Sequence, residues 1–383
     1  METAAADTYA LTDEQLEFRD TIRRIVADRV APRAAEIDAK AEYPWDIRRL
    51  FAEHDLLGLP FGTEHGGTGT LMLNVAVEEV ARACASSALI LMIQELGTLP
   101  IQLYGSDELK QRFLPRCASG EWSPAFALSE PEAGSDPGGM ITRAVRDGDE
   151  WVINGTKNWI TNLGVADFYI VFAKTDPSAG RSRGISAFVV EADRPGFSIG
   201  KLEHKLGIKG SPTGQPIFED VRVPAGNLIG DENRGMQVAL GTLDHSRLGV
   251  AAQAVGIAQG ATDHAAVYAC ERRQFGQPIA DFQGIQFKLA DMETRTAAAR
   301  ELLYRACAKI DRGEADAGKY SAMAKLFASD TAMAVTVEAV QVLGGYGYVT
   351  EYPVERYMRD AKITQIYEGT NEIQRLVIAR ALR

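Results

Sequence analysis

The residue of this chain best suited to act as a base is Glu368, in a run that reads IYEGTNEIQ from residue 366 to residue 374. Glu368 lies between an aromatic residue and a glycine, just before a segment with the pattern of an amphipathic helix. The glycine lets a ligand approach the backbone, and the helix N-terminus offers free N–H donors to anionic groups. An apolar pocket would raise the pKa of the carboxyl group and make it a stronger base. A glutamate in the first turn of a helix is also common without any function, and this run alone favours that interpretation.

The composition indicates a globular protein of two or three domains. The chain has 383 residues, with 46% hydrophobic and 24% charged residues. Its net charge of -11 argues against non-specific binding to nucleic acid or to an anionic membrane. The four cysteines, Cys84, Cys117, Cys270 and Cys307, are far apart, and no pair of histidines has HExxH spacing. We therefore expect neither a metal site nor a disulfide framework. We also expect that the protein functions in a reducing compartment.

The N-terminus and the apolar segments indicate the subcellular location and whether the chain enters a membrane. Residues 1–10 contain Glu2 and Asp7 and no basic residue, unlike a signal or transit peptide. We therefore expect a cytoplasmic protein, or a mature organellar form whose transit peptide is absent. The apolar stretch at residues 88–93 is too short to span a bilayer, so no membrane insertion is expected.

Three regions with different patterns of apolar and polar residues must position Glu368. Residues 1–121 are expected to form a helical N-terminal domain, with a capping box of Thr12 and Gln15 at its first helix. Apolar helical segments at residues 71–104 are expected to break near Gly97 and Pro100.

The middle region, residues 122–235, changes to a strand pattern. Short strand-like runs are separated by Asp147–Gly148 and by Asn154–Gly155, which are strong hairpin signals. Because no helix separates the runs, we expect an antiparallel β-domain. Residues 236–383 return to long Ala-rich helical segments, which indicate a C-terminal four-helix bundle. The predicted fold class is therefore α+β with three domains.

The familiar fingerprints of other enzyme classes are missing from the sequence. No GxGxxG follows a predicted strand, and neither a GxxxxGK[ST] loop nor a GxSxG elbow occurs. A Rossmann dehydrogenase, a P-loop enzyme and a serine hydrolase are therefore disfavoured.

Three other runs place polar and aromatic residues at the ends of predicted elements. They read AFALSEPEAGSD at residues 125–136, NWITN at residues 158–162 and RRQFG at residues 272–276. A loop such as the first can bind anions through its backbone N–H groups, but a surface turn explains it as well. A Trp at a strand end is more often part of a core, and two cations at a helix C-terminus are favourable without a ligand.

Together with QVLGGYGY at residues 341–348 and the run around Glu368, these motifs resemble the acyl-CoA dehydrogenase family. The motifs occur in the family's order, and the resemblance spans nearly the whole chain. It implies a helical domain, a β-domain and a four-helix bundle, in agreement with the helix and strand patterns of the three regions. It also implies FAD as cofactor, an acyl-CoA substrate, electron-transfer flavoprotein as electron acceptor, and a homotetramer.

The resemblance assigns the FAD contacts to two sets of residues. One set would surround the flavin and its phosphates within one subunit: Phe126, Leu128, Ser129, Ser135, Trp159, Thr161, Thr370, Asn371 and Glu372. The other set would contact the FAD of a neighbouring subunit: Arg272, Phe275, Gln283, Gln341 and Gly345.

The resemblance also implies the chemistry. Glu368 would remove the α-proton of an acyl thioester while the flavin N5 accepts the β-hydride, which gives a trans-2-enoyl-CoA. The Glu368 backbone N–H and a flavin ribityl hydroxyl would stabilise the charge on the thioester oxygen. The residues on the substrate side would be Ser135, Asp244, Arg247, Tyr367 and Gly369.

One feature of the sequence distinguishes between two placements of the base. Some family members carry the base just before the arginine equivalent to Arg247, but this chain has Ser246 there and an acid at residue 368. The C-terminal placement of the base is therefore favoured. The resemblance suggests a short or branched-chain acyl-CoA, with the helix at residues 89–96 forming part of the pocket floor.

Two other functions remain open at this level. An acyl-CoA oxidase would keep the fold and the base but pass electrons to oxygen. A non-catalytic binding or DNA-associated member of the superfamily would be expected to show a basic surface, whereas this chain is acidic.

Overall fold

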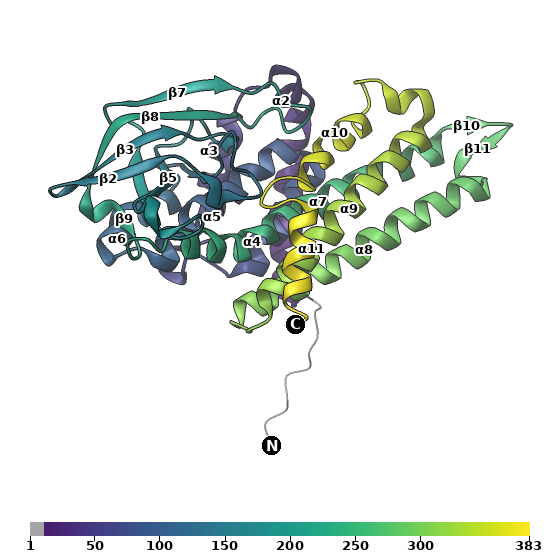
Figure 1. Cartoon of the computed structure of the whole chain (residues 1–383). Coiled ribbons are helices and arrows are strands. Elements are labelled where there is room, and N and C mark those ends of the chain that lie inside the picture. The colour runs from purple at the N-terminus through teal and green to yellow at the C-terminus, as the bar shows by residue number, and fades with distance from the viewer. Residues whose placement is uncertain (1–10) are drawn as a thin grey trace.

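The computed structural model describes residues 11–383, in which two helical parts flank a β-sheet (Figure 1). The expectation for the N-terminal segment concerns residues 1–10 and so lies outside the described residues. The observed order of a helical part, a sheet and a second helical part is the order that the sequence predicts.

Between residues 11 and 121, six α-helices form the N-terminal part. They are α1 (Asp13–Ile25), α2 (Ala34–Lys40), α3 (Trp45–Glu53), α4 (Thr70–Ala83), α5 (Ala85–Tyr104) and α6 (Asp107–Ala118). The predicted capping box is confirmed, because the Thr12 hydroxyl accepts from the Gln15 N–H and the Gln15 side chain accepts from the Thr12 N–H. This reciprocal pair satisfies two N–H groups that the first turn leaves free.

The predicted break near Gly97 and Pro100 is wrong, because α5 runs through both residues. The helical segment is interrupted instead at Cys84, which has an extended backbone between α4 and α5. A Cβ atom at Gly97 would lie 2.5 Å from the Pro124 Cβ, so this glycine permits close packing of α5 on the sheet. Burial along residues 85–101 outweighs the low helix propensity of both residues.

The middle part is a nine-stranded sheet. Its strands are β1 (Pro124–Ala127), β2 (Arg143–Asp147), β3 (Glu150–Thr156), β4 (Ile160–Thr161), β5 (Phe168–Lys174), β6 (Ile185–Glu191), β7 (Phe197–Leu202), β8 (Thr213–Pro224) and β9 (Leu228–Ile229). The main order is β4-β8-β3-β2-β5-β6-β9, with β1 beside β5 and β7 beside β8. Most pairs are antiparallel, as predicted, but β1 and β2 run parallel to β5.

Of the two predicted hairpin turns, one is confirmed and one is wrong. β2 and β3 pair antiparallel across the turn at Gly148, which has φ +62°. Asn154 and Gly155 form no turn, because β3 continues through them with a bulge opposite β8. A Cβ atom at Gly155 would clash with the Thr142 side chain, so this glycine also allows two chain segments, β3 and Thr142, to pack closely.

The C-terminal part is a bundle whose long helices lie side by side (Figure 1). Its elements are α7 (Gly235–Glu271), the hairpin β10 (Arg273–Gln274) and β11 (Gln277–Pro278), α8 (Gln283–Asp311), α9 (Ala317–Leu343), α10 (Val354–Thr364) and α11 (Asn371–Arg380). The hairpin lies at the end of the bundle farthest from the sheet. One apolar cluster joins this bundle to the N-terminal helices, for example through Leu91, Ala254 and Ala328. The two helical parts therefore form one support for any residue between them.

Among the described residues, one helix, Ala317–Tyr348, is long and apolar enough to cross a membrane by length and composition alone. Half of its most apolar window is buried inside the bundle. A bundle's core helix has the same character, so this helix is weak evidence for a membrane span. Within residues 11–383, no group of three or more His, Cys, Asp or Glu side chains could hold a metal ion.

Candidate active site

Glu368 lies in the short loop between α10 and α11, and the loop has an unusual backbone. Glu368 has φ +53° and Gly369 has φ +90°, so two successive residues are left-handed. The next residue, Thr370, caps α11, because its hydroxyl accepts from the Ile373 N–H at 3.4 Å. A left-handed backbone at a residue other than glycine is strained by about 1 kcal/mol or more, and such residues cluster at functional sites.

The Glu368 side chain is partly buried, and its carboxyl group has one direct hydrogen-bond donor. The Ser246 hydroxyl of α7 donates to Glu368 Oε2 at 2.6 Å. Burial raises the pKa of Glu368 to about 7, against the opposing effects of the Ser246 hydroxyl and of the nearby Arg247 and Lys325 cations. A carboxyl group with this pKa is suited to general-base catalysis near neutral pH.

Lys325 of α9 fixes the loop that carries Glu368. Its buried ammonium donates to the Gly369 carbonyl oxygen at 2.8 Å and to Asn371 Oδ1 at 2.9 Å. Burial lowers the pKa of Lys325 to about 7, although the Glu368 charge opposes that shift. Asn371 is bound further by its amide group, which donates to Asp330 Oδ1 at 2.7 Å. The loop is therefore held by α9 as well as by its own helix cap.

Except for Ser135, the other residues predicted on the substrate side lie in this loop or on α7, which contacts it. Arg247 is buried and donates to Asp244 Oδ1 at 2.7 Å, while its Nε is buried without a hydrogen-bond partner in the described structure. The Tyr367 hydroxyl donates to Gln253 Oε1, and Gln253 in turn donates to the Ala85 carbonyl oxygen at 2.9 Å. The structure thus brings the predicted residues of α7 to the predicted base. Glu372 lies outside this cluster and is exposed.

The residues predicted to line the flavin lie at strand ends of the sheet. Lys157 and Glu130 form a buried ion pair at 2.8 Å, and Lys157 also donates to the Leu128 carbonyl oxygen at 3.0 Å. The Ser129 carbonyl oxygen accepts from the Asn158 N–H at 2.9 Å. These contacts bind the segment after β1 to the segment before β4. Their effect is to place two of the predicted flavin-binding runs next to each other.

Within this group, the Trp159 side chain is unusually exposed. Trp159 has φ +63°, and 58% of its surface is accessible. Thr161 is half-buried on β4, Ser135 is exposed, and Phe126 is half-buried against both the helical core and the sheet. An exposed indole held on a rigid strand end offers a flat apolar face, which fits stacking against a planar ring system.

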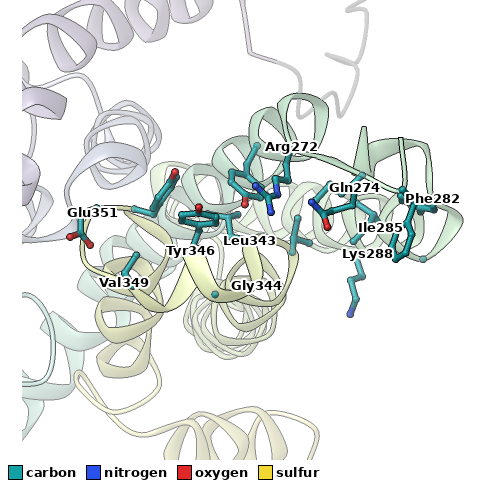
Figure 2. Close-up of a pocket in the computed structure, with 17 residues that line it drawn as sticks. Arg272, Gln274, Phe282, Ile285, Lys288, Leu343, Gly344, Tyr346, Val349 and Glu351 are labelled. Atoms are coloured by element: carbon teal, nitrogen blue, oxygen red, sulfur yellow. The ribbon is translucent and has the colours of Figure 1, made fainter. Parts of the chain in front are cut away.

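The remaining predicted FAD contacts lie elsewhere. Arg272, Phe275 and Gly345 line an open groove of about 970 Å³ between the β10–β11 hairpin and residues 344–352, and Figure 2 shows Arg272 beside Tyr346. Phe275 is 95% exposed. Gln283 and Gln341 are exposed residues at the ends of α8 and α9 but do not line this groove.

The groove lies far from the Glu368 loop within one chain. Lys325 and Gln341 are 16 residues apart on α9, which corresponds to about 24 Å along the helix axis. The structure therefore does not bring these two sets of predicted residues together within one chain.

Three residues near Glu368 were not among the predicted site residues: Ser246, Lys325 and Glu95. The sequence contained a signal for Ser246, because it occupies the position where some relatives carry the base and so must lie near Glu368. Lys325 is a single cation in the apolar run SAMAKLFAS, a pattern typical of a buried charge with a specific partner. Glu95 follows the apolar stretch of α5 and is 5% exposed.

Comparison with known proteins identifies the family. The acyl-CoA dehydrogenase N-terminal domain matches residues 12–121, the middle domain matches residues 125–221, and the C-terminal domain matches residues 233–383. The chain belongs to the acyl-CoA dehydrogenase family. It is 50% identical to probable acyl-CoA dehydrogenase fadE25 of Mycobacterium bovis, over 98% of this chain and 97% of that protein. It is 46% identical to the short-chain specific acyl-CoA dehydrogenase of Clostridium acetobutylicum, over 97% of this chain and 98% of that protein.

Solved structures agree with this assignment. Butyryl-CoA dehydrogenase of Megasphaera elsdenii matches with a TM-score of 0.95 and 45% identity, over 98% of this chain and 99% of that chain. A glutaryl-CoA dehydrogenase of Mycobacterium smegmatis in complex with FADH2 matches with a TM-score of 0.90 and 31% identity, over 97% and 95%. A chain from a structure named for the electron transferring flavoprotein of Acidaminococcus fermentans matches with a TM-score of 0.95 and 44% identity, over 98% and 99%. The predicted family, fold class and enzyme class are therefore confirmed.

Proposed function

We propose that this acyl-CoA dehydrogenase family member oxidises a short acyl-CoA to the trans-2-enoyl-CoA, with FAD as cofactor and Glu368 as the base. The observation that carries the proposal is the Glu368 carboxyl group itself. It is partly buried, its pKa is raised to about 7, and a hydroxyl and two cations from other helices lie near it. The relatives named for butyryl-CoA and for short-chain substrates support the substrate class.

The residues present fit a flavin. Trp159 offers an exposed ring at a strand end, and the Ser129 carbonyl oxygen accepts a hydrogen bond from the N–H of the preceding residue, Asn158. Bound FAD would supply a two-electron acceptor for the hydride that leaves the β-carbon. The neighbour solved with FADH2 supports this cofactor.

The protein's part in the reaction begins with proton transfer to Glu368. Ionised Glu368 accepts the α-proton, and the Ser246 hydroxyl orients the carboxylate for that step. The Glu368 backbone N–H makes no hydrogen bond within residues 11–383, so it is available to the thioester oxygen. A general base contributes about 10²–10⁴-fold to the rate, and one donor to a developing oxyanion contributes about 10²–10³-fold.

The distant groove suggests an oligomer. The resemblance places Arg272, Phe275 and Gly345 against FAD, yet they lie near the far end of α9 from the Glu368 loop. A neighbouring subunit that inserts this end of its bundle against the flavin would reconcile the two observations. We therefore propose the homotetramer, with electrons passed to electron-transfer flavoprotein. The related chain from the structure named for that flavoprotein supports the electron acceptor.

The test is the substitution Glu368→Gln, which removes the base and keeps the side-chain volume. The purified variant should remain yellow, but flavin reduction by butyryl-CoA under anaerobic conditions should slow by at least about 10²-fold. Glu301→Gln is the control, because Glu301 is an exposed acid on α8. Reduction of the variant at close to the wild-type rate would refute the role of Glu368, and a protein that cannot bind FAD would refute the cofactor. Release of peroxide at the turnover rate in air would select the oxidase alternative.

A further inference from the structure

Gln374, in the first turn of α11, reaches back to the loop that carries the base. Its side chain is fully buried, and its Nε2 group donates to the Glu368 carbonyl oxygen at 3.2 Å and to the Gly369 carbonyl oxygen at 2.9 Å. Gly369 permits this approach, because a Cβ atom there would lie 2.9 Å from Gln374 Nε2. One buried amide therefore binds the carbonyl oxygens of both left-handed residues of the loop.

The orientation of this amide leaves one of its own atoms unpaired. Gln374 Oε1 is buried and accepts no hydrogen bond within residues 11–383. The reverse orientation would point Oε1 at two carbonyl oxygens, which can only accept hydrogen bonds. An unpaired buried oxygen is destabilising. A side chain that leaves such an oxygen unpaired and directs its donors at the base loop is better explained by a role in the site than by stability.

The bound carbonyl oxygens set the direction of the Glu368 backbone. A peptide group is planar, so a hydrogen bond to its carbonyl oxygen orients the whole group. On the preceding side, the chain leaves α10, where the Tyr367 N–H donates to the Ile363 carbonyl oxygen at 3.1 Å. On the following side, Gln374 holds the peptide group that joins Glu368 to Gly369. Glu368 is thereby held between two anchored segments, with φ +53°.

Resting on the proposed function, we propose that Gln374 is a positioning residue, which holds the strained backbone of Glu368 so that its N–H reaches the thioester oxygen. A left-handed backbone is unfavourable for a glutamate and relaxes when its support is removed. Relaxation turns the N–H away from the oxygen that gains charge as the α-proton leaves. Lys325 cannot replace Gln374, because its ammonium binds the Gly369 carbonyl oxygen and Asn371 rather than the Glu368 carbonyl oxygen.

The first experiment separates kcat from KM. Charge on the thioester oxygen develops in the transition state, so the loss of this positioning should lower kcat and leave KM nearly unchanged. Gln374→Met removes both hydrogen bonds at similar volume, and kcat for anaerobic flavin reduction by butyryl-CoA, per bound flavin, should fall at least about tenfold. The control is Asn227→Leu, which removes a buried amide that donates to the Val189 carbonyl oxygen at 2.8 Å in the sheet. It should keep the wild-type kcat.

A second measurement reports the contact with the oxygen without hydride transfer. Acetoacetyl-CoA has an α-carbon acidic enough to form an enolate in the site, with its proton passing to Glu368, because the second carbonyl group shares the charge. The affinity for this enolate, followed by its ultraviolet absorption, should fall at least about tenfold in Gln374→Met. It should not change in Asn227→Leu, because a loss of global stability does not alter the affinity of the folded site.

Gln374→Glu covers the case in which Gln374→Met does not fold. It keeps the shape of the side chain, but a carboxylate only accepts hydrogen bonds and cannot hold the two carbonyl oxygens, so kcat should fall at least as far. A wild-type kcat or enolate affinity in either folded variant, or an equal loss in Asn227→Leu, would overturn the positioning role, while flavin reduction in the wild type still upheld the proposed function. If butyryl-CoA does not reduce the wild-type flavin, the proposed function fails and this inference fails with it.

Discussion

Replacing Ser246 with alanine should raise the pKa of Glu368 and slow flavin reduction at neutral pH. The hydroxyl donates to Glu368 Oε2 at 2.6 Å and is the main effect that lowers this pKa. A hydrogen bond to a charged group contributes about 1.5–3 kcal/mol. Since one pKa unit corresponds to about 1.4 kcal/mol, the loss of the hydroxyl should raise the pKa by about one to two units.

The effect on the rate follows from the fraction of Glu368 that is ionised. Only the carboxylate accepts a proton, so the rate rises as pH passes through the pKa, which is about 7 in the wild-type chain. At pH 7, a rise of about one unit reduces the ionised fraction from about one half to about one tenth, and the rate falls about fivefold. A rise of about two units gives a fall of roughly 50-fold. At a pH well above the new pKa, the variant should recover most of its rate.

The assay is the rate of flavin bleaching by butyryl-CoA in an anaerobic stopped-flow instrument, recorded as a function of pH. Ser246→Thr retains a hydroxyl and should keep a profile close to that of the wild type. Thr242→Val is the matched control, because Thr242 lies one turn earlier on α7 and its hydroxyl donates to the Val238 carbonyl oxygen at 2.9 Å. A Ser246→Ala profile that superimposes on the wild-type profile would show that the hydroxyl does not set the pKa of the base.

Three further predictions concern the support of the site. Trp159→Ala should lower the ratio of FAD to protein after gel filtration, because it removes an exposed ring; an unchanged ratio would contradict stacking. Lys325→Met should lower the free energy of unfolding by about 1–3 kcal/mol, because the Gly369 carbonyl oxygen and Asn371 Oδ1 lose a buried donor; urea unfolding with no change in midpoint would contradict it. The raised pKa of Glu95 means that its protonated form stabilises the fold below its ordinary pKa and that this stability is lost as pH rises through about 8. The Tm of Glu95→Gln minus the Tm of the wild type should therefore increase from about pH 6 to about pH 9. An equal Tm difference at both pH values would exclude this linkage.

Much of the fold could be predicted because hydrophobic periods and turn residues are local signals. The capping box of Thr12 and the turn at Gly148 are confirmed for this reason. The predictions at Gly97 and Gly155 are wrong, because a glycine needed for a turn and a glycine needed for close packing look alike in a sequence. In the structure, Gly97 lets α5 approach the sheet and Gly155 lets β3 approach Thr142. Only the partner across the contact distinguishes the two cases.

The same limit applies to the site, where the sequence indicated the base but not what sets its proton affinity. The contact of Ser246 with Glu368 spans 122 positions in the chain, and Lys325 and Glu95 come from two other helices. The pKa of Glu368 results from burial, which raises it, and from a hydroxyl and two cations, which lower it. Each of these contributions depends on helix packing, so a short motif around the acid cannot encode them. A relative could therefore keep the run around Glu368 unchanged and still work at a different pH or on a different acyl group, through substitutions on α5, α7 or α9 alone.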